Sequence, residues 1–287
     1  MSYVLLPDQL RETADRVKAF LQKEQGLRKV QIEAAIDDSI NWRPTLSGAT
    51  SDHHIVCVEV TSGGYTNAFD HAVIQCTTAG LPVRFYIAYS DDEMTGEHFR
   101  KTFDNARMRG VGIIEVKGKT CTIVHRAVEL SLASVRRVDR PRLKQKYRQA
   151  FSDAEETFLG GDPPKGCLRV FEELETLSRK FVQKGNAEGW WNPAFKQKQI
   201  DGPWATLMME VVKQMDSSLS KIKKDCPKFD ASLITTIHGL TKQRNESGHK
   251  PKTRAALIKR DRELRTRFEH AVDVFMDFQD ATSSLRL

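Results

Sequence analysis

The feature that most constrains the fold is a change in hydrophobic pattern a little before the middle of the 287-residue chain. Up to residue 132, short runs of apolar residues alternate with short amphipathic segments. Beyond that point, each long segment has its apolar residues at helical spacing. The first pattern predicts an α/β domain with a mostly parallel sheet, and the second predicts an all-α helical bundle. We therefore expect two domains, residues 1–133 and 147–287, joined by a basic linker at residues 134–146.

The first domain is expected to alternate strands with helices. Strands are predicted at residues 54–60, 83–89, 111–116 and 120–125, and helices at residues 5–24, 66–79 and 96–109. Gly118 marks a tight turn, so the last two strands should form a hairpin. The other strands should lie parallel, because strands that alternate with helices are usually joined by right-handed crossovers.

The second domain is expected to be a helical bundle with one loop-rich excursion. Helices are predicted at residues 145–159, 167–184, 204–224, 232–247 and 253–279, with a turn at 160–164. The excursion, residues 185–203, contains Trp190, Trp191 and Phe195. Aromatic side chains in a loop either stack on nucleic-acid bases or fix the loop to its core, and we favour the second interpretation.

Composition narrows the class of protein. The formal net charge is +7, which favours polyanionic partners, and no apolar run is long enough to span a membrane. Five cysteines are scattered along the chain without zinc-site spacing, and the first residues have no signal-peptide pattern. We expect a cytoplasmic protein with reduced thiols, no disulfides, no bound metal and no cofactor.

The basic residues gather in two runs. The first consists of Arg136, Arg137, Arg140, Arg142, Lys144, Lys146 and Arg148. The second consists of Lys242, Arg244, Lys250, Lys252, Arg254, Lys259, Arg260, Arg262, Arg265 and Arg267. For the first run, a solvated helix face and a polyanion-binding surface are equally good interpretations. For the second we favour an RNA-facing surface, because it surrounds the motif described next.

One short motif combines two groups suited to phosphate chemistry. Arg244 lies in the last turn of a predicted helix, and His249 follows it. Gly248 fits the position just past a helix C-terminus, and Pro251 is typical of the residues beyond it. A guanidinium can hold a phosphate in a fork, and an imidazole can transfer a proton near neutral pH. The alternative is a capped helix end with a solvated Arg and His.

This motif resembles the signature of the HEPN superfamily, in which an Arg, usually a polar residue, a short spacer and a His follow one another. Here the polar residue is Asn245, and four residues separate Arg244 from His249. Residues 147–185 also resemble the opening helix pair of a HEPN domain, with its turn at 160–164. The resemblance covers roughly half of the chain, residues 147–287.

The resemblance implies a metal-independent endoribonuclease that cleaves RNA by attack of its own 2′-hydroxyl. Arg244, Asn245 and His249 would be catalytic, and the surrounding residues that would bind RNA are Lys242, Lys250, Lys252 and Arg254. The family implies a homodimer with two motifs facing one cleft, and an effector role as a bacterial toxin or in antiphage defence, held in check by a regulatory protein such as an antitoxin. Glu172 or Glu175 would pair with Arg244, unless both face solvent. The alternative function is a non-catalytic nucleic-acid-binding or assembly protein that uses the bundle as a dimer platform.

The first domain resembles a second family, the PD-(D/E)xK nucleases with their restriction-endonuclease-like fold, over residues 32–132. The resemblance rests on Arg43-Pro44 and on the predicted strand that carries Glu59. Thr45 and Thr61 stand where the family has an Asp and a Lys. One carboxylate is a poor magnesium site, so we expect an inactive domain in which Glu59 is hydrogen-bonded to a neighbouring Thr or Ser. A metal-dependent DNA nuclease that uses Glu59 is the weakest alternative.

Overall fold

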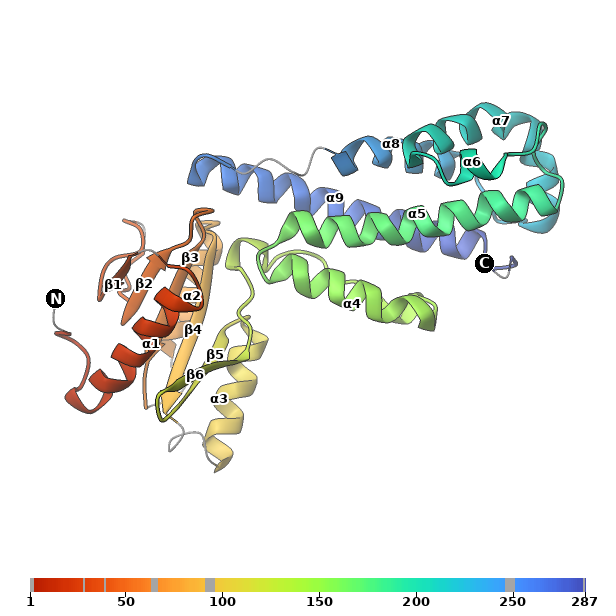
Figure 1. The fold of residues 1–287 in the computed structure, drawn as a ribbon. Helices are drawn as coiled ribbons and strands as arrows, with labels where there is room; N and C mark the ends of the chain where they lie inside the picture. The colour runs from red at the N-terminus through yellow and green to blue at the C-terminus, as the bar shows by residue number, and fades with distance from the viewer. Residues whose placement is uncertain are drawn as a thin grey trace. The chain divides into compact units, whose positions relative to one another are not determined.

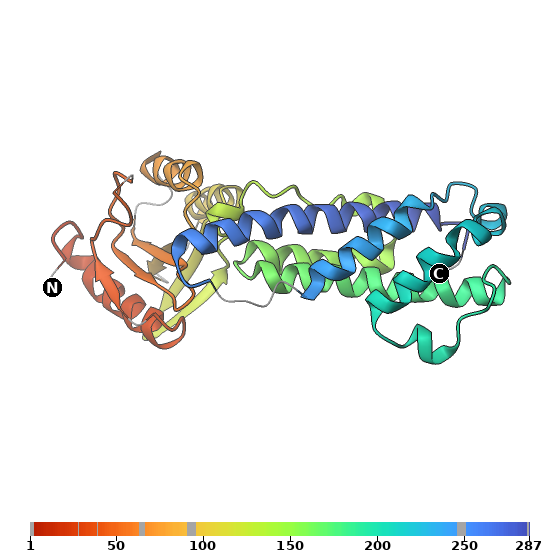
Figure 2. The ribbon, with the colours of Figure 1, turned by 90° about the horizontal axis from the view of Figure 1, so that it is seen from above.

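The computed structural model describes residues 3–27, 29–38, 40–62, 67–90, 96–245, 251–285 and 287 (Figures 1 and 2). The chain divides into two compact units. The first, here called the α/β unit, consists of Met1–Val135, Leu159–Gly161 and Lys250–Arg262. The second, the helical unit, consists of Arg136–Phe158, Asp162–His249 and Glu263–Leu287. An α/β region followed by a helical region is the fold class that the sequence predicts.

The α/β unit is built on a mixed sheet. In the described part of the chain its strands are β1 (Val30–Ile32), β2 (Leu46–Ala49), β3 (Ile55–Val60), β4 (Val83–Ser90), β5 (Gly112–Lys117) and β6 (Thr120–His125), which lie in that order. Strands β3, β4 and β5 are parallel, while β1–β2, β2–β3 and β5–β6 pair antiparallel. The predicted hairpin is confirmed, but the expectation of a mostly parallel sheet is wrong. The short strands β1 and β2, three and four residues long, carry too little alternation to be read from sequence.

Helices cover both faces of this sheet. Helix α1 (Arg11–Lys23) packs through Val17 and Leu21 on the face that carries Val58 and Ile114. Helices α2 (Asn67–Thr78) and α3 (Gly96–Met108) lie on the opposite face, as the orange and yellow helices of Figure 2 show. Successive residues of β3 serve the two layers, because side chains alternate along a strand.

The helical unit consists mainly of long helices, with one four-residue helix in the loop between two of them. They are α4 (Gln145–Leu159), α5 (Pro163–Ala187), α6 (Gln197–Ile200), α7 (Trp204–Asp225), α8 (Ser232–Asn245) and the part of α9 (Arg254–Ala281) from Glu263 onward. Helix α5 begins four residues earlier than predicted: Asp162 accepts a hydrogen bond from the Lys165 amide, and proline is favoured in a first helical turn. Phe158 and Phe181 of α4 and α5 contact Phe268 and Phe278 of α9, with ring centroids 4.5 and 5.2 Å apart.

The aromatic loop of this unit is part of its core. Trp190, Trp191 and Phe195 are at most 5% exposed. The indole of Trp190 donates to Asp225 at 2.7 Å, and that of Trp191 donates to the carbonyl of Val182 at 3.0 Å. The favoured interpretation, that these rings fix the loop, is confirmed, and they are not available for stacking on bases.

Three of the five arginines in the first basic run are ion-paired within the helical unit. Arg136 pairs with Asp273, Arg140 pairs with Glu155, and Arg142 pairs with both Asp277 and Asp280. Most of its guanidinium charge is therefore matched by carboxylates of α4 and α9. All five cysteine thiols are free. Among the described residues, we find no helix that combines the length and the apolar character needed to cross a membrane.

Candidate functional site

Arg244 is carried by the last turn of a well-anchored helix. Helix α8 begins at Ser232, whose backbone amide donates to the Asp230 carboxylate at 2.8 Å. Ile237 and Leu240 are at most 1% exposed in the bundle core. Arg244 follows Leu240 by one turn, so its side chain emerges at the border of the buried face and is 31% exposed.

The guanidinium of Arg244 belongs to a small charge network, here called the motif cluster, with Glu175 and Arg179. Nη1 of Arg244 donates to Oε2 of Glu175. The other oxygen, Oε1, accepts from Nε of Arg179 at 3.0 Å, one turn along α5. Arg179 is itself fixed, because its Nη2 donates to the carbonyl of Gly202 at 2.8 Å and its Nη1 to that of Ile200. Of the two candidate partners of Arg244, the structure selects Glu175.

The remaining predicted site residues are only partly described. Residues 246–250, which include His249 and Lys250, and the side chain of Asn245 lie outside the described residues. Lys242 is exposed on the same turn as Arg244. Lys252 is exposed before α9, and Arg254 contacts Asp37 at 3.5 Å, both within the α/β unit. Among the predicted catalytic residues, Arg244 is the one whose side chain is described, and the structure places it with Glu175 and Arg179.

Glu59 is a hydrogen-bonded carboxylate at the end of β3. Its Oε2 accepts from the backbone amide of Thr45 at 2.9 Å, and the Thr45 hydroxyl accepts from the amide of Val60 at 3.2 Å. Burial raises the pKa of Glu59 to about 7, against the opposing hydrogen bonds from Thr45 and with a further increase from the charge of Glu33. In the described residues, no three His, Cys, Asp or Glu side chains are grouped to hold a metal ion.

A second charge cluster lies inside the α/β unit and was not predicted from the sequence. We call His54, Arg84, Glu129 and Asp261 the buried cluster. Glu129 is 0% exposed, and its Oε2 lies 2.5 Å from Nδ1 of His54 and 3.6 Å from Nε of Arg84. Its Oε1 accepts from the hydroxyl of Ser131 at 2.9 Å. Burial alone would raise the pKa of Glu129, but the hydrogen bond and charge of His54, with Arg84, lower it below its ordinary value.

Asp261 is the second acid of this cluster, and its pKa is shifted in the opposite direction. It is 2% exposed, and burial raises its pKa to about 6, helped by the negative charge of Glu129 and opposed by Arg260 and His54. Its Oδ2 has no hydrogen-bond partner among the described residues, which fits a protonated carboxyl at mildly acidic pH. The cluster members are far apart in sequence. The one local signal is a charged residue, Arg84, within the apolar strand β4.

Comparisons with protein-family models, with curated proteins and with solved structures gave no match to this chain. What the chain does is therefore inferred from its own side chains. Of the two charge clusters, the buried cluster keeps its carboxylates from solvent and exposes 22% of the Arg84 side chain, while the motif cluster exposes 31% of the Arg244 side chain. The motif cluster is accordingly the better candidate for contact with a ligand.

Proposed function

We propose that this protein is a metal-independent endoribonuclease that uses Arg244 and His249, and that it acts in the cytoplasm as a toxin or antiphage-defence effector. The observation that carries the proposal is the geometry of Arg244. Nη1 contacts Glu175, but a guanidinium has five N–H donors and 31% of this side chain is exposed. Donors therefore remain for a phosphate, while the Glu175–Arg179 network limits how far the guanidinium can move.

The proposed reaction uses the nucleophile that RNA already carries. The 2′-oxygen attacks phosphorus and loses its proton to a base, while the bond from phosphorus to the 5′-oxygen breaks and that oxygen takes a proton from an acid. The products are a 2′,3′-cyclic phosphate and a free 5′-hydroxyl. Arg244 would stabilise the charge that builds on the phosphate oxygens. His249 would transfer one of the two protons, and Asn245 would orient the phosphate or the imidazole.

The single His of each motif leaves the second proton transfer without a group. In our proposal a homodimer supplies it, with a second motif facing the same cleft. Lys242, Lys250, Lys252 and Arg254 would hold neighbouring phosphates of the RNA. Glu175 would offset the charge of Arg244 in the resting protein and fix the direction of its fork, since Glu175 is itself held by Arg179.

The test is cleavage of total RNA by the purified full-length protein in EDTA. We expect His249→Ala to lower the rate by at least about 100-fold, the usual worth of a general acid or base. Arg244→Lys should also impair cutting strongly, because an ammonium lacks the planar fork. His270→Ala is the matched control, an exposed His on α9 that should cut normally.

Two results would contradict the proposal. Cutting by His249→Ala at the wild-type rate would remove the proton-transfer role, and loss of cutting in EDTA would point to metal chemistry instead. Binding of RNA by the wild-type protein without any cleavage would favour the alternative, a non-catalytic binding or assembly protein. The weakest alternative is a metal-dependent DNA nuclease that uses Glu59. It would be supported if the wild-type protein cleaved DNA with a divalent metal and Glu59→Ala abolished that cleavage.

A further inference from the structure

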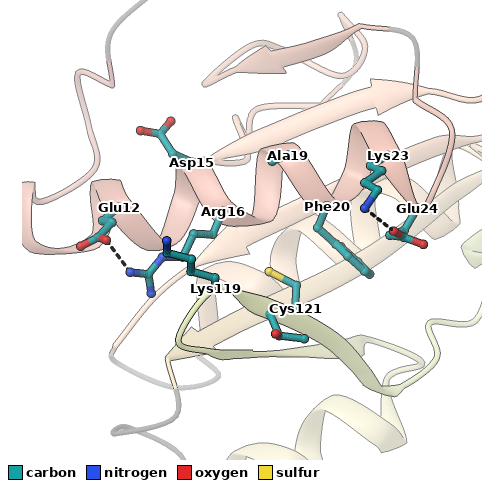
Figure 3. Close-up of a pocket in the computed structure, with 10 residues that line it drawn as sticks. Glu12, Asp15, Arg16, Ala19, Phe20, Lys23, Glu24, Lys119 and Cys121 are labelled. Carbon is teal, nitrogen blue, oxygen red and sulfur yellow. Dashed lines mark hydrogen bonds and ion pairs between the residues drawn. The ribbon is translucent and has the colours of Figure 1, made fainter.

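A groove runs between α1 and the hairpin strand β6 in the α/β unit (Figure 3). Its volume is about 850 Å³. Ala19, Phe20 and Cys121 line it with apolar or weakly polar atoms, and charged residues of α1 and the hairpin stand around them. Ala19 is exposed, so the groove is open to solvent beside the helix.

Strand β6 is the edge of the sheet at this groove. Within the described residues it pairs with β5 only, because it is last in the strand order. It contains no charged residue and no proline, the features that usually protect an edge from another strand. A register shift opposite Ile113 and Ile114 affects its His125 end, while residues 120–123 are paired regularly with β5. About four residues of regular edge therefore border the groove.

The direction of the β6 side chains links this edge to the groove. Cys121 and Ile123 are half-buried and pack on the α1 side of the sheet. A strand added beside β6 would place every second side chain on that same side, next to Cys121 and Ile123. Those side chains would lie over Ala19 and Phe20, so one segment can use the edge and the groove together.

The charges around β6 indicate what kind of segment fits. Two acids of the groove are matched by bases: Glu12 pairs with Arg16, and Glu24 lies 3.7 Å from Lys23. The third, Asp15, accepts from the neutral Tyr3 hydroxyl at 3.0 Å and points away from the hairpin (Figure 3). Lys119 precedes β6 and Arg126 follows it, and both side chains are exposed. Neither has a carboxylate partner in the part of the chain that the structure describes. The unmatched charge at both ends of the edge is positive.

We propose that β6 and this groove bind an extended acidic segment of a partner protein by strand addition. Backbone hydrogen bonds to β6 would supply affinity, and apolar side chains over Phe20 would supply selectivity. Acidic side chains at the two ends of the segment would face Lys119 and Arg126. This surface belongs to the α/β unit and does not depend on the proposed cleavage chemistry.

Fluorescence anisotropy with the full-length protein can test the proposal. The probe is a fluorescein-labelled hexapeptide of alternating glutamate and valine. One matched peptide has lysine in place of glutamate, and another has N-methylated backbone amides that prevent strand pairing. A labelled oligouridylate tests whether the same surface prefers RNA.

We expect the acidic peptide to bind and each matched peptide to bind at least tenfold more weakly. The lysine peptide loses the charge attraction, and the N-methylated peptide loses the backbone hydrogen bonds to β6. Ala19→Trp fills the groove, and Lys119→Glu reverses the charge, so each should weaken binding by about tenfold or more. Ala187→Trp and Lys228→Glu make the same changes at exposed positions of the helical unit and should bind normally.

Circular dichroism of each variant separates loss of binding from loss of folding. Equal binding of the N-methylated peptide would contradict strand addition, and equal binding of the lysine peptide would contradict the charge preference. Binding of the oligouridylate alone, sensitive to Lys119→Glu, would make this a nucleic-acid surface instead. Failure of the acidic peptide to bind at millimolar concentration would also overturn the proposal.

Discussion

Two clusters of charged side chains in this protein use similar residue types but differ in their exposure. In the buried cluster, Glu129 and Asp261 are 0% and 2% exposed. In the motif cluster, the side chains of Arg244 and Glu175 are 31% and 16% exposed. A buried charge must be compensated by its neighbours in the fold, whereas a part-exposed one can exchange a neighbour for a ligand.

The difference shows why a charged cluster is not by itself a functional site. The buried cluster joins His54, before β3, to Arg84 on β4, to Glu129 and to the first turns of α9. Its role is inferred to be structural, because its two carboxylates are buried and its part-exposed member, Arg84, is held by Glu129 and by the carbonyl of Gly161. The motif cluster restrains one guanidinium at a helix end and leaves donors facing outward. The following predictions test this contrast.

The largest effect is expected from Glu129→Gln in the buried cluster. The change leaves His54 and Arg84 without their shared carboxylate, and breaking a buried ion pair from one side costs about 3–5 kcal/mol. Urea unfolding of the full-length protein should show this loss in the transition of the α/β unit. Glu24→Gln, an exposed Glu of the same unit, is the matched control. A loss below about 1 kcal/mol, the value for a surface pair, would show that the cluster does not stabilise the fold.

The next prediction separates the two buried acids by pH. Asp261 has an ordinary pKa of 3.8 when unfolded and a pKa of about 6 in the fold. As pH rises through this window, the unfolded chain releases the proton first, so the contribution of Asp261 to stability falls. Asp261→Asn removes that fall. The unfolding free energy of the variant, relative to that of the wild type, should therefore rise by up to about 3 kcal/mol as pH increases between these two values.

The measurement is the free energy of unfolding in urea at several pH values across this window. The contact between Arg260 and Asp261, 3.3 Å long, opposes the rise of the Asp261 pKa and is therefore already part of this titration. Glu129 acts in the opposite direction, because its lowered pKa gives stability that is fully present above the ordinary value of 4.5 and is lost as pH falls from there through the lowered pKa. Parallel profiles for wild type and variant would show that Asp261 titrates normally in the fold.

The sequence predicted long elements of secondary structure better than short ones. Helix α4 was predicted at residues 145–159, the bounds observed, because fifteen residues repeat the helical period several times. Strands β1 and β2 are too short to repeat theirs, and without them the sheet was predicted to be mostly parallel. Length of the repeating pattern, more than composition, decided which elements could be found.

The two clusters also differ in how far they could be predicted from the sequence. Arg244 could be found because its motif is contiguous in sequence, and Glu175 was one of two candidates on a neighbouring predicted helix. The sequence could not choose between Glu172 and Glu175, because helix packing decides which one meets Arg244, and Glu172 is exposed. The buried cluster had no local pattern, since its members come together only when the sheet and the start of α9 are assembled.

A third prediction concerns the motif cluster, where the effect should be on activity. Glu175→Gln keeps a hydrogen-bond acceptor near Arg244 but removes the charge that fixes both guanidiniums. Charge-assisted hydrogen bonds contribute about 1.5–3 kcal/mol, so we expect RNA cleavage to fall by about tenfold or more. The fold should survive, because the side chain is part-exposed. Glu172→Gln, one turn away and exposed, should cut normally. Equal activity of both variants would show that Arg244 needs no support from Glu175.

The smallest effect is expected at an exposed ion pair of the helical unit. Arg136 and Asp273 have side chains that are 59% and 39% exposed, so water screens their attraction. Asp273→Asn should lower the unfolding free energy of the helical unit by less than about 1 kcal/mol, as for most surface pairs. Raising the salt concentration should shrink even that difference, whereas the loss in Glu129→Gln should persist because its site excludes solvent. If Asp273→Asn lowered the unfolding free energy as much as Glu129→Gln, an exposed ion pair would stabilise the fold as strongly as a buried one. Exposure would then not explain the difference between buried and part-exposed charges in this protein.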